Sequence, residues 1–375
     1  MSEEAVDADT GTGASTGTDT GASTDRGVAE VVCLGESMAV LLPDRQGPLE
    51  EVGSFRPAVG GAESNVACAL ARFGVRSAWI SRVGDDGFGR RLRSAIGAYG
   101  VDVSAVAVDP HRPTGVYLKE TGGSPHPYDL GPGRSRLHYY RSGSAASALS
   151  PGLLTDPRAA RLLDGARLLH LSGITPALSD SCLELVRALL RDRRGTRLVS
   201  FDLNWRAALW HDRDPAVLAP LLDAADLLLI GSDEAETAFG EGDAHALRRM
   251  FPGPGTLVVK DSGNAATALG RDGAVVTEPA LTVEVVEATG AGDAFAAGYL
   301  AGTLRGLGPQ GRLRLGHLSA ASALTAHGDQ GTPPDPDTVT ALLAATPGEW
   351  ARTRVSASGI VSPALPGGAA GGTGR

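Results

Sequence analysis

The feature that most constrains the fold is a regular alternation of short apolar runs with helical patterns along the middle of the chain. Strands are predicted at residues 31–34, 77–83, 168–172, 197–202, 227–230 and 256–260. Helices are predicted at residues 64–73, 89–99, 179–193, 233–239, 293–304 and 312–327. This alternation favours a mostly parallel sheet with helices on both faces. Because ligands of such sheets bind beyond the carboxyl ends of the strands, the polar residues that follow the strands are expected to share one crevice.

Two segments break this alternation, and two more flank it. Residues 38–59 and 113–141 carry alternating residues and turn formers without a helical pattern. They predict added antiparallel strands, either as a small β lid over the crevice or as a structural edge.

Segments 1–27 and 353–375 are poor in large apolar side chains and cannot bury enough surface to offset chain entropy. We therefore expect disordered tails around one domain at 28–352.

Composition and charge argue against several classes of protein. No apolar stretch approaches the roughly 20 residues that span a bilayer, and the amino terminus lacks the pattern of a secretory signal. Cys33, Cys68 and Cys182 are far apart among apolar neighbours, which indicates buried thiols in a reducing cytoplasm. The net charge of −9 argues against a nucleic-acid surface. Only two of the 34 basic residues are lysines, Lys119 and Lys260.

The most informative motif is Glu-Ala-Thr-Gly-Ala-Gly-Asp-Ala-Phe at residues 287–295. Gly290, Ala291 and Gly292 bring backbone N–H groups to the start of a helix, where unpaired amides and the helix dipole bind anions. Asp293 on the first turn could take a proton from a nucleophile that attacks the bound anion, which indicates phosphoryl transfer to an alcohol. A turn that merely starts a helix is the alternative. A dinucleotide-binding turn is disfavoured, because a phenylalanine stands at the third small position and the run lies late in the chain.

Three motifs, in order and spacing, resemble the ribokinase-like (PfkB) family of sugar kinases over roughly residues 28–350. They are Gly-Gly-Ala-Glu-Ser-Asn at 60–65, Gly-Asp-Asp-Gly-Phe-Gly at 84–89 and the turn at 290–293. Three more are similar to the 2-keto-3-deoxygluconate kinase branch: Tyr-Tyr-Arg-Ser-Gly-Ser-Ala at 139–145, His-Leu-Ser-Gly-Ile at 170–174 and Asp-Leu-Asn-Trp-Arg at 202–206. The resemblance implies a Rossmann-like α/β core with a β lid. It also implies ATP-dependent transfer to a terminal sugar hydroxyl, with Asp293 as the base.

Two arginines bear on the substrate. Arg141 closes the second lid segment and Arg206 follows a core strand, so both could face the crevice. A planar guanidinium suits a substrate carboxylate, whereas a neutral hexose needs hydroxyl partners. Ordinary surface arginines are the alternative. Tyr117 and Tyr139 would supply hydroxyl contacts and apolar walls, or would only pack the lid.

The resemblance implies further sugar contacts. Gly60, Gly61 and Asn65 resemble the family's sugar-binding turn, where glycine lets backbone approach a polyol and an amide both donates and accepts. A tight turn at the start of a helix is the alternative. Asp329, which follows Gly328, resembles a site residue of the keto-deoxy-sugar-acid kinases, or it only forms a turn.

The nucleotide site is expected at the late turn, because neither a Walker motif nor a protein-kinase signature occurs. The resemblance implies these nucleotide-binding residues: Asn204, Lys260, Asp261, Gly263, Asn264, Gly290 and Gly292. Lys260 could neutralise phosphate charge or only solvate the end of a strand.

Two positions depart from the family's pattern. Its Asn-x-x-Glu motif, associated with magnesium through water, is assigned here to Asp233-Glu234-Ala235-Glu236, which implies Glu236 as the metal-linked residue. Mg²⁺ is expected because ATP phosphates need charge neutralisation. The residue six before Asp293 is usually aspartate but is Glu287 here, so the local turn and any monovalent-ion site stay open.

These features predict an ATP-dependent kinase that phosphorylates the terminal hydroxyl of 2-keto-3-deoxygluconate. One alternative is a fructokinase or ribokinase activity on a neutral sugar. Another is a sugar or nucleotide sensor without catalysis, which the intact turn with its aspartate disfavours. The sequence does not separate gluconate- from galactonate-derived acids. Because lid sheets of this family often pair between subunits, a homo-oligomer is expected, with neither a nucleic acid nor a membrane as partner.

Overall fold

The computed structural model describes residues 28–192, 197–211, 213–326, 328 and 331–366. The predicted amino-terminal tail, 1–27, and the predicted substrate residue Asp329 lie outside these residues. None of the helices in the described ranges combines the length and apolar character needed to cross a membrane. Cys33, Cys68 and Cys182 are free and buried, as the sequence predicts.

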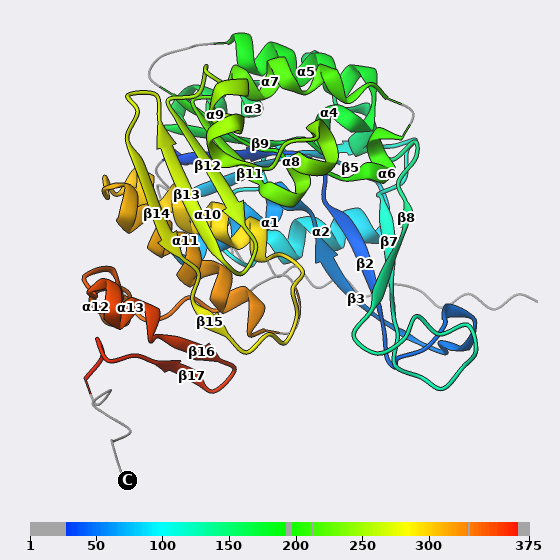
Figure 1. The fold of residues 1–375 in the computed structure, drawn as a ribbon. Helices are drawn as coiled ribbons and strands as arrows, with labels where there is room; N and C mark the ends of the chain where they lie inside the picture. The colour runs from blue at the N-terminus through cyan, green and yellow to red at the C-terminus, as the bar shows by residue number, and fades with distance from the viewer. Residues whose placement is uncertain (1–27, 193–196, 212, 327, 329–330, 367–375) are drawn as a thin grey trace, which may run out of the picture.

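A central sheet forms the core of the molecule (Figure 1). Among the described residues it has eight strands in the order β14-β13-β12-β11-β10-β9-β1-β4. Their bounds are β1 (Val31–Leu34), β4 (Ser77–Ile80), β9 (Leu168–Ser172), β10 (Leu198–Asp202), β11 (Leu227–Gly231), β12 (Thr256–Asp261), β13 (Ala265–Gly270) and β14 (Val275–Pro279). The strands from β4 to β12 pair in parallel, and β13 and β14 add antiparallel pairs at one edge. The predicted α/β fold class is confirmed.

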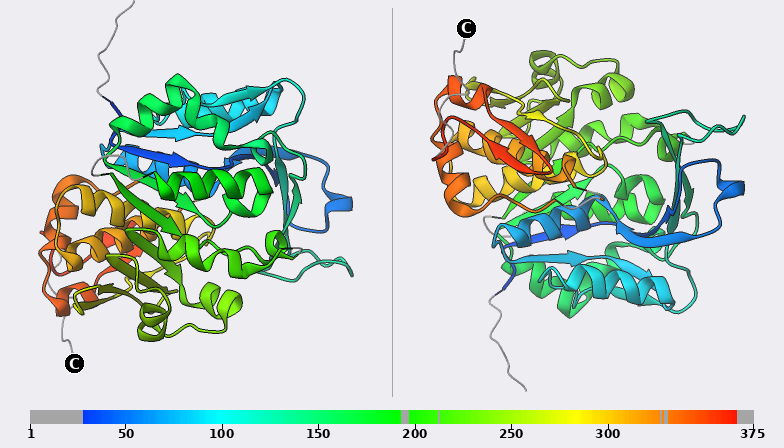
Figure 2. Two further views of the ribbon diagram at one scale, coloured as in Figure 1. Left: turned by 90° about the horizontal axis from the view of Figure 1, so that it is seen from above. Right: turned by 90° about the horizontal axis from the view of Figure 1, so that it is seen from below.

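Helices cover both faces of this sheet, as Figure 2 shows from above and below. One face carries α3 (Pro157–Gly165), α5 (Asp180–Arg191), α7 (Ala219–Asp223) and α9 (Ala244–Met250). The other carries α1 (Ala62–Arg72), α2 (Gly87–Gly97), α10 (Ala291–Leu304) and α11 (Pro309–Leu324). Along β1, Val32 and Leu34 pack into the first layer, while Val31 and Cys33 pack into the second. This alternation of side chains makes β1 apolar on both faces.

A second sheet, the lid sheet, stands to one side of the core (Figure 1). It consists of β2 (Met38–Pro43), β3 (Phe55–Gly60), β7 (Val116–Thr121) and β8 (Ser135–Tyr140), in the order β3-β2-β7-β8. These strands come from the two segments predicted to leave the core, and its action as a lid stays a prediction. The other short elements are β5 (Arg82–Gly84), β6 (Ala107–Asp109), α4 (Thr175–Leu178), α6 (Ala207–Trp210) and α8 (Ser232–Phe239).

The carboxyl-terminal boundary predicted at residue 352 is wrong. Strands β16 (Arg354–Ser356) and β17 (Gly359–Val361) extend a small sheet that begins with β15 (Thr282–Val283). Helices α12 (Pro336–Leu343) and α13 (Pro347–Ala351) precede them. Val355 is buried against Trp350 of α13, so few apolar side chains and backbone pairing are enough to order this segment. Residues 367–375 lie outside the described part of the chain.

Candidate active site

The turn before α10 has the geometry that the motif predicts. Gly290 is the N-cap residue and has a φ of +81°, a left-handed conformation that glycine adopts without steric penalty. Ala291 and Gly292 open the helix, and Gly292 is exposed. The first amides of α10 are therefore presented at a helix N-terminus, which favours an anion. Asp293 lies on the same first turn.

Two amide side chains hold the carboxylate of Asp293. Asn65 Nδ2, from α1, donates to Asp293 Oδ2 at 2.9 Å. Asn204 Nδ2, from the segment after β10, donates to Asp293 Oδ1 at 3.2 Å. Asn204 has a φ of +42°, an uncommon left-handed conformation for a residue other than glycine. The orientation of the carboxylate is thus fixed from two separate elements.

Lys260, in β12, is paired with Asp202, the last residue of β10. Lys260 Nζ lies 3.0 Å from Asp202 Oδ1 and 2.8 Å from Asp202 Oδ2. Burial lowers the pKa of Lys260, but the carboxylates of Asp202 and Glu234 outweigh it, so the net pKa is raised and the ammonium stays charged. A Cβ built on Gly292 would lie 3.9 Å from Lys260 Nζ. The charge therefore sits beside the anion-binding turn.

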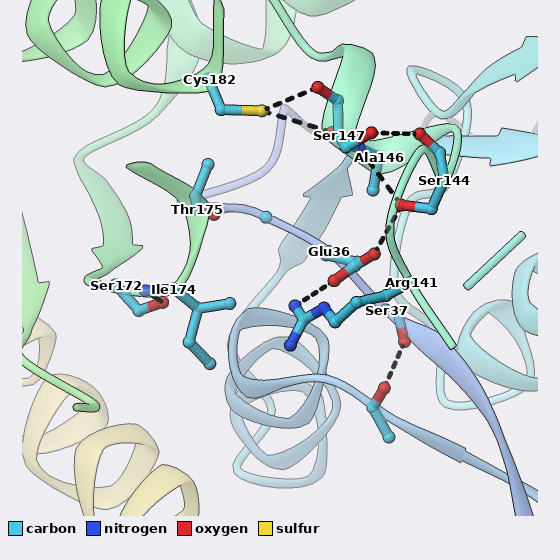
Figure 3. A network of polar contacts seen from close by, with 12 residues as sticks. Glu36, Ser37, Arg141, Ser144, Ala146, Ser147, Ser172, Ile174, Thr175 and Cys182 are labelled. Atoms are coloured by element: carbon cyan, nitrogen blue, oxygen red, sulfur yellow. Dashed lines mark hydrogen bonds and ion pairs between the residues drawn. The ribbon is translucent and has the colours of Figure 1, made fainter. Parts of the chain in front are cut away.

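A buried ion pair joins Glu36, which follows β1, to Arg141, which follows β8 (Figure 3). Ser144 Oγ donates to the other oxygen, Glu36 Oε1, at 2.9 Å. The Arg141 side chain is 9% exposed, and its Nε has no partner among the described residues. Glu36 thus orients a guanidinium group that keeps a free donor.

Aromatic rings line the lid side of Arg141. Tyr117 in β7 and Tyr139 in β8 lie directly opposite each other, with ring centroids 5.5 Å apart. The Arg141 guanidinium lies 5.6 Å from the Tyr139 ring, within cation–π range. Tyr117 is buried and Tyr139 is exposed. The lid sheet therefore presents a packed pair of rings next to an oriented arginine.

Gly61 is required by close approach of the backbone. A Cβ at this position would lie 2.5 Å from the Glu36 carbonyl oxygen and 2.7 Å from Ser37 Cα. Gly61 caps α1, and Gly60 ends β3. This tight crossing brings the end of the lid sheet, the segment after β1 and the helix that carries Asn65 to one place.

A buried carboxylate that the sequence did not single out lies next to this crossing. Glu63 is completely buried, and its Oε1 accepts hydrogen bonds from Ser172 Oγ at 2.7 Å and Thr175 Oγ1 at 3.0 Å. Oε2 has no partner among the described residues. Burial raises the pKa of Glu63 to about 7.

Comparison with known proteins identifies the family. The model of the pfkB family carbohydrate kinases matches residues 28–336. The chain is 37% identical over 321 residues to a 2-dehydro-3-deoxygluconokinase of Thermoproteus tenax, covering 84% of this chain and 94% of that protein. It is 33% identical over 328 residues to a 2-dehydro-3-deoxygluconokinase of Bacillus subtilis (strain 168), covering 84% and 96%.

A solved structure agrees. The PfkB protein from Polaromonas sp. JS666 superposes with a TM-score of 0.72 at 32% identity, covering 85% of this chain and 100% of that one. The chain belongs to the pfkB family of carbohydrate kinases. The resemblance drawn from the motifs is confirmed, and so is the enzyme class, a phosphotransferase that acts on a sugar hydroxyl.

The structure brings several predicted pfkB site residues to the carboxyl ends of the central strands. Asp293, Asn65, Asn204 and Lys260 form one connected cluster. Arg206 lies at its edge, with a side chain that is 46% exposed and a guanidinium nitrogen 3.5 Å from Glu234. Its place is therefore intermediate between the crevice and the open surface.

The predicted nucleotide loop lies further out. Asp261, Gly263 and Asn264 are exposed at the turn between β12 and β13. Asn264 Nδ2 donates to Asp261 Oδ2 at 3.1 Å, and Ser232 Oγ at the start of α8 lies 3.5 Å from Asp261 Oδ1. The described contacts do not join these residues directly to Asp293, so their contact with a nucleotide stays a prediction.

The two glutamates of the acidic motif, Glu234 and Glu236, lie in different surroundings on α8. Glu236 is exposed on α8, whereas Glu234 faces Lys260 and Asp202. Burial raises the pKa of Glu234 above its ordinary value, although the charge of Lys260 opposes this. The Gly231 amide donates to Glu234 Oε2 at 3.2 Å. The predicted role of Glu236 beside a hydrated metal ion stays a prediction.

Sequence reasoning also missed Glu36 and Asp202 as parts of the site. Both follow or end a central strand, which is the one signal that could have singled them out. Among the described residues, no group of three or more histidine, cysteine or acidic side chains could hold a metal ion. Because Mg²⁺ in kinases is usually held by one or two carboxylates and substrate phosphates, this observation does not bear on the expected ion.

Proposed function

We propose that this kinase transfers the γ-phosphoryl group of ATP to the terminal hydroxyl of 2-keto-3-deoxygluconate (2-dehydro-3-deoxygluconate). The observation that carries the proposal is the identity of 37% and 33% to two 2-dehydro-3-deoxygluconokinases, each over 84% of this chain. Each match extends over most of the chain, so the similarity is not confined to a single motif.

Asp293 acts as the base in this proposal. The sugar hydroxyl oxygen forms a bond to the γ-phosphorus while the bond from phosphorus to the ADP oxygen breaks. The hydroxyl proton passes to the carboxylate of Asp293, which the amides of Asn65 and Asn204 already hold in place. A positioned base of this kind contributes typically 10²–10⁴-fold to the rate.

The phosphoryl group would be stabilised by the turn at Gly290–Gly292. Its amides are fixed before the reaction, so they stabilise developing charge without reorganising. Lys260 adds a positive charge on the same side, next to Gly292. Asp202 neutralises the charge of Lys260 and fixes its side chain. The main contribution of Lys260 would therefore be the placement of its ammonium group, more than its net charge.

A magnesium ion fits this donor set through few protein ligands. When bound to ATP, Mg²⁺ supplies charge neutralisation at the phosphates. Glu236 is the predicted residue that would hold hydrated Mg²⁺. Glu234, the acidic side chain of α8 that faces Lys260, would assist it. Its raised pKa reflects a buried carboxylate that a cation would stabilise.

The sugar acid would be oriented between the lid sheet and the core. Arg141 has a buried Nε without a described partner, which could donate to a substrate carboxylate. Arg206 supplies a second, more exposed guanidinium. Tyr117, Tyr139 and the backbone at Gly60 and Gly61 would face the polyol chain.

An ATP-coupled assay tests the proposal. Turnover of 2-keto-3-deoxygluconate is compared with 2-keto-3-deoxygalactonate, fructose and ribose. We expect the two sugar acids to give the highest kcat/KM, and Arg206→Ala to lower kcat/KM for the acids while the matched exposed variant Arg271→Ala does not. Equal turnover of neutral sugars, unaffected by Arg206→Ala, would identify a neutral-sugar kinase. Absence of turnover with every sugar, but with tight sugar binding, would identify a sensor.

Homo-oligomerisation through the lid belongs to the same proposal. Strand β8 is an edge strand of the lid sheet, and its Leu137, Tyr139 and Tyr140 are 37%, 38% and 66% exposed. An apolar edge strand is open to pairing with another chain. Light scattering should give a dimer or larger assembly that Tyr140→Lys weakens, and a monomer mass at all concentrations would contradict the assembly.

A further inference from the structure

The only two lysines of this chain lie on either side of the catalytic loop, residues 287–293. The sequence uses arginine at nearly all of its 34 basic positions, so lysine at both of these places is unusual. Lys260 sits beside Gly292, and Lys119 of lid strand β7 forms an ion pair with Glu287. Lysine provides a compact point charge with three donors, whereas arginine provides a planar fork. A small, ammonium-sized cation is thus placed at each end of this loop.

Glu287 joins three parts of the molecule. Its Oε1 accepts from Lys119 Nζ of the lid sheet, and its Oε2 accepts from the amide of Gly328 at 3.1 Å. The backbone amides of Val286 and Glu287 donate to the Leu324 carbonyl, the last of α11, at 2.8 and 3.2 Å. The residue is therefore anchored by side chain and backbone only three positions before Gly290, where the anion-binding turn begins.

The ion pair is largely shielded from water. The side chains of Lys119 and Glu287 are 16% and 19% exposed, so the charge of each is only weakly screened. Burial raises the pKa of Glu287, but the Lys119 hydrogen bond and charge, with the Gly328 amide, bring the net pKa below its ordinary value. Without Lys119, an ionised carboxylate would stand unpaired near the place where a transferred phosphoryl group carries negative charge.

The space beside the ion pair suits a small cation. A pocket of about 30 Å³ lies beside the pair, lined by Lys119, Glu287, Thr289 and Gly328 and by apolar side chains of the lid sheet. This volume has room for a species the size of a water molecule. Truncation of the Lys119 side chain would enlarge it next to an acidic oxygen, so ammonium or potassium could enter where a larger organic cation could not.

We propose that Lys119 is a positioning residue whose ammonium group serves as a built-in monovalent cation for the catalytic loop. By neutralising Glu287 it holds the segment that leads into Gly290, and it makes the geometry of the anion-binding turn depend on the position of the lid sheet. The inference rests on phosphoryl transfer to a sugar, not on which sugar is used.

The test is cation rescue of Lys119→Ala. Steady-state kcat and KM are measured with one sugar and ATP, in tetramethylammonium, potassium or ammonium chloride at equal ionic strength. We expect the unchanged enzyme to respond to none of these salts. Lys119→Ala should lose roughly 10-fold or more in kcat in tetramethylammonium, and ammonium or potassium should restore most of it. The matched control Arg136→Ala, which removes an exposed cation from lid strand β8, should behave like the unchanged enzyme.

A second variant keeps the test decisive if Lys119→Ala folds poorly. Lys119→Met combined with Glu287→Gln removes both charges and retains most of the volume, so it should fold, show higher kcat than Lys119→Ala in tetramethylammonium and ignore added cations. Normal kcat of Lys119→Ala without small cations would overturn the proposal. So would a loss of kcat in well-folded Lys119→Ala that neither ammonium nor potassium reverses.

Discussion

The Asn65 side chain donates a hydrogen bond of 2.9 Å to the Asp293 carboxylate across 228 positions of sequence. It joins the first turns of two helices, α1 and α10, that pack against each other on the same face of the sheet. The turn at Gly61, predicted to face the sugar, and the turn at Gly290, predicted to bind an anion, are therefore held in a fixed relation. Asp293, the proposed base, lies at this contact.

Replacing Asp293 by asparagine should remove catalysis and leave binding. The amide cannot accept the hydroxyl proton, so kcat should fall by roughly 10²–10⁴-fold. Sugar affinity, measured by calorimetry, should change little because the side chain keeps its size. Asp337→Asn, at an exposed position on α12, is the control and should keep full turnover. Turnover near that of the unchanged enzyme would exclude Asp293 as the base.

Asn204 should be sensitive to charge more than to size. Asn204→Ala removes the donor that lies 3.2 Å from Asp293 Oδ1, while Asn204→Asp places a second carboxylate there. Repulsion between like charges should make Asn204→Asp the slower enzyme, by roughly a further 10-fold in kcat at neutral pH. Steady-state kinetics of both variants measure this order. If the alanine variant were equally slow or slower, the contact would act by packing alone.

The central strands and the catalytic turn could be predicted because their signals are local. β9 matches the predicted range 168–172, and the first turn of α10 carries Asp293 as expected. Short apolar runs and a glycine-rich helix start are fixed by neighbours in sequence. The antiparallel pair β13 and β14 was not predicted. Apolar and polar residues alternate only weakly along these strands, and their register is set by pairing with β12 at the edge of the sheet.

The partners of the site residues could not be predicted, because they lie far apart in the sequence. Glu36 and Arg141 are separated by 105 positions, and Lys119 and Glu287 by 168. No local pattern specifies which carboxylate an arginine or lysine will meet. Which of Glu234 and Glu236 faces Lys260 likewise depends on how α8 packs against the sheet, and the sequence of the helix alone does not define that side.

Glu63 should make stability depend on pH. The carboxyl is buried, and its pKa is raised from 4.5 to about 7 in the folded protein. Well below pH 4.5 the Glu63 carboxyl is protonated in both the folded and the unfolded state. As pH rises from 4.5 towards 7, the unfolded state releases this proton and the folded state keeps it, so the free energy of unfolding decreases. Glu63→Gln cannot ionise, and its free energy of unfolding should exceed that of the unchanged protein by an amount that grows with pH, to about 1–3 kcal/mol near pH 8.

Thermal and denaturant unfolding between about pH 5 and pH 8 measures this difference. Glu50→Gln, an exposed carboxyl in the lid region, is the control and should give a difference that does not vary with pH. A pH-independent effect of Glu63→Gln would mean that Glu63 stays ionised in the folded protein throughout this range.

Shortening the chain should distinguish the predicted tail from the structured one. A chain that ends at residue 352 loses β16 and β17 and uncovers Trp350, whose ring packs with Val355 and whose Nε1 donates to the Pro279 carbonyl at 2.8 Å. Loss of the buried Val355 side chain alone costs about 1.5–3 kcal/mol. A chain that ends at 366 keeps these contacts and is the control. We expect the shorter chain to melt roughly 2–4 °C lower or more, while the longer one keeps the full melting temperature and turnover. Equal melting temperatures would mean that residues 353–366 add nothing to the stability of the fold.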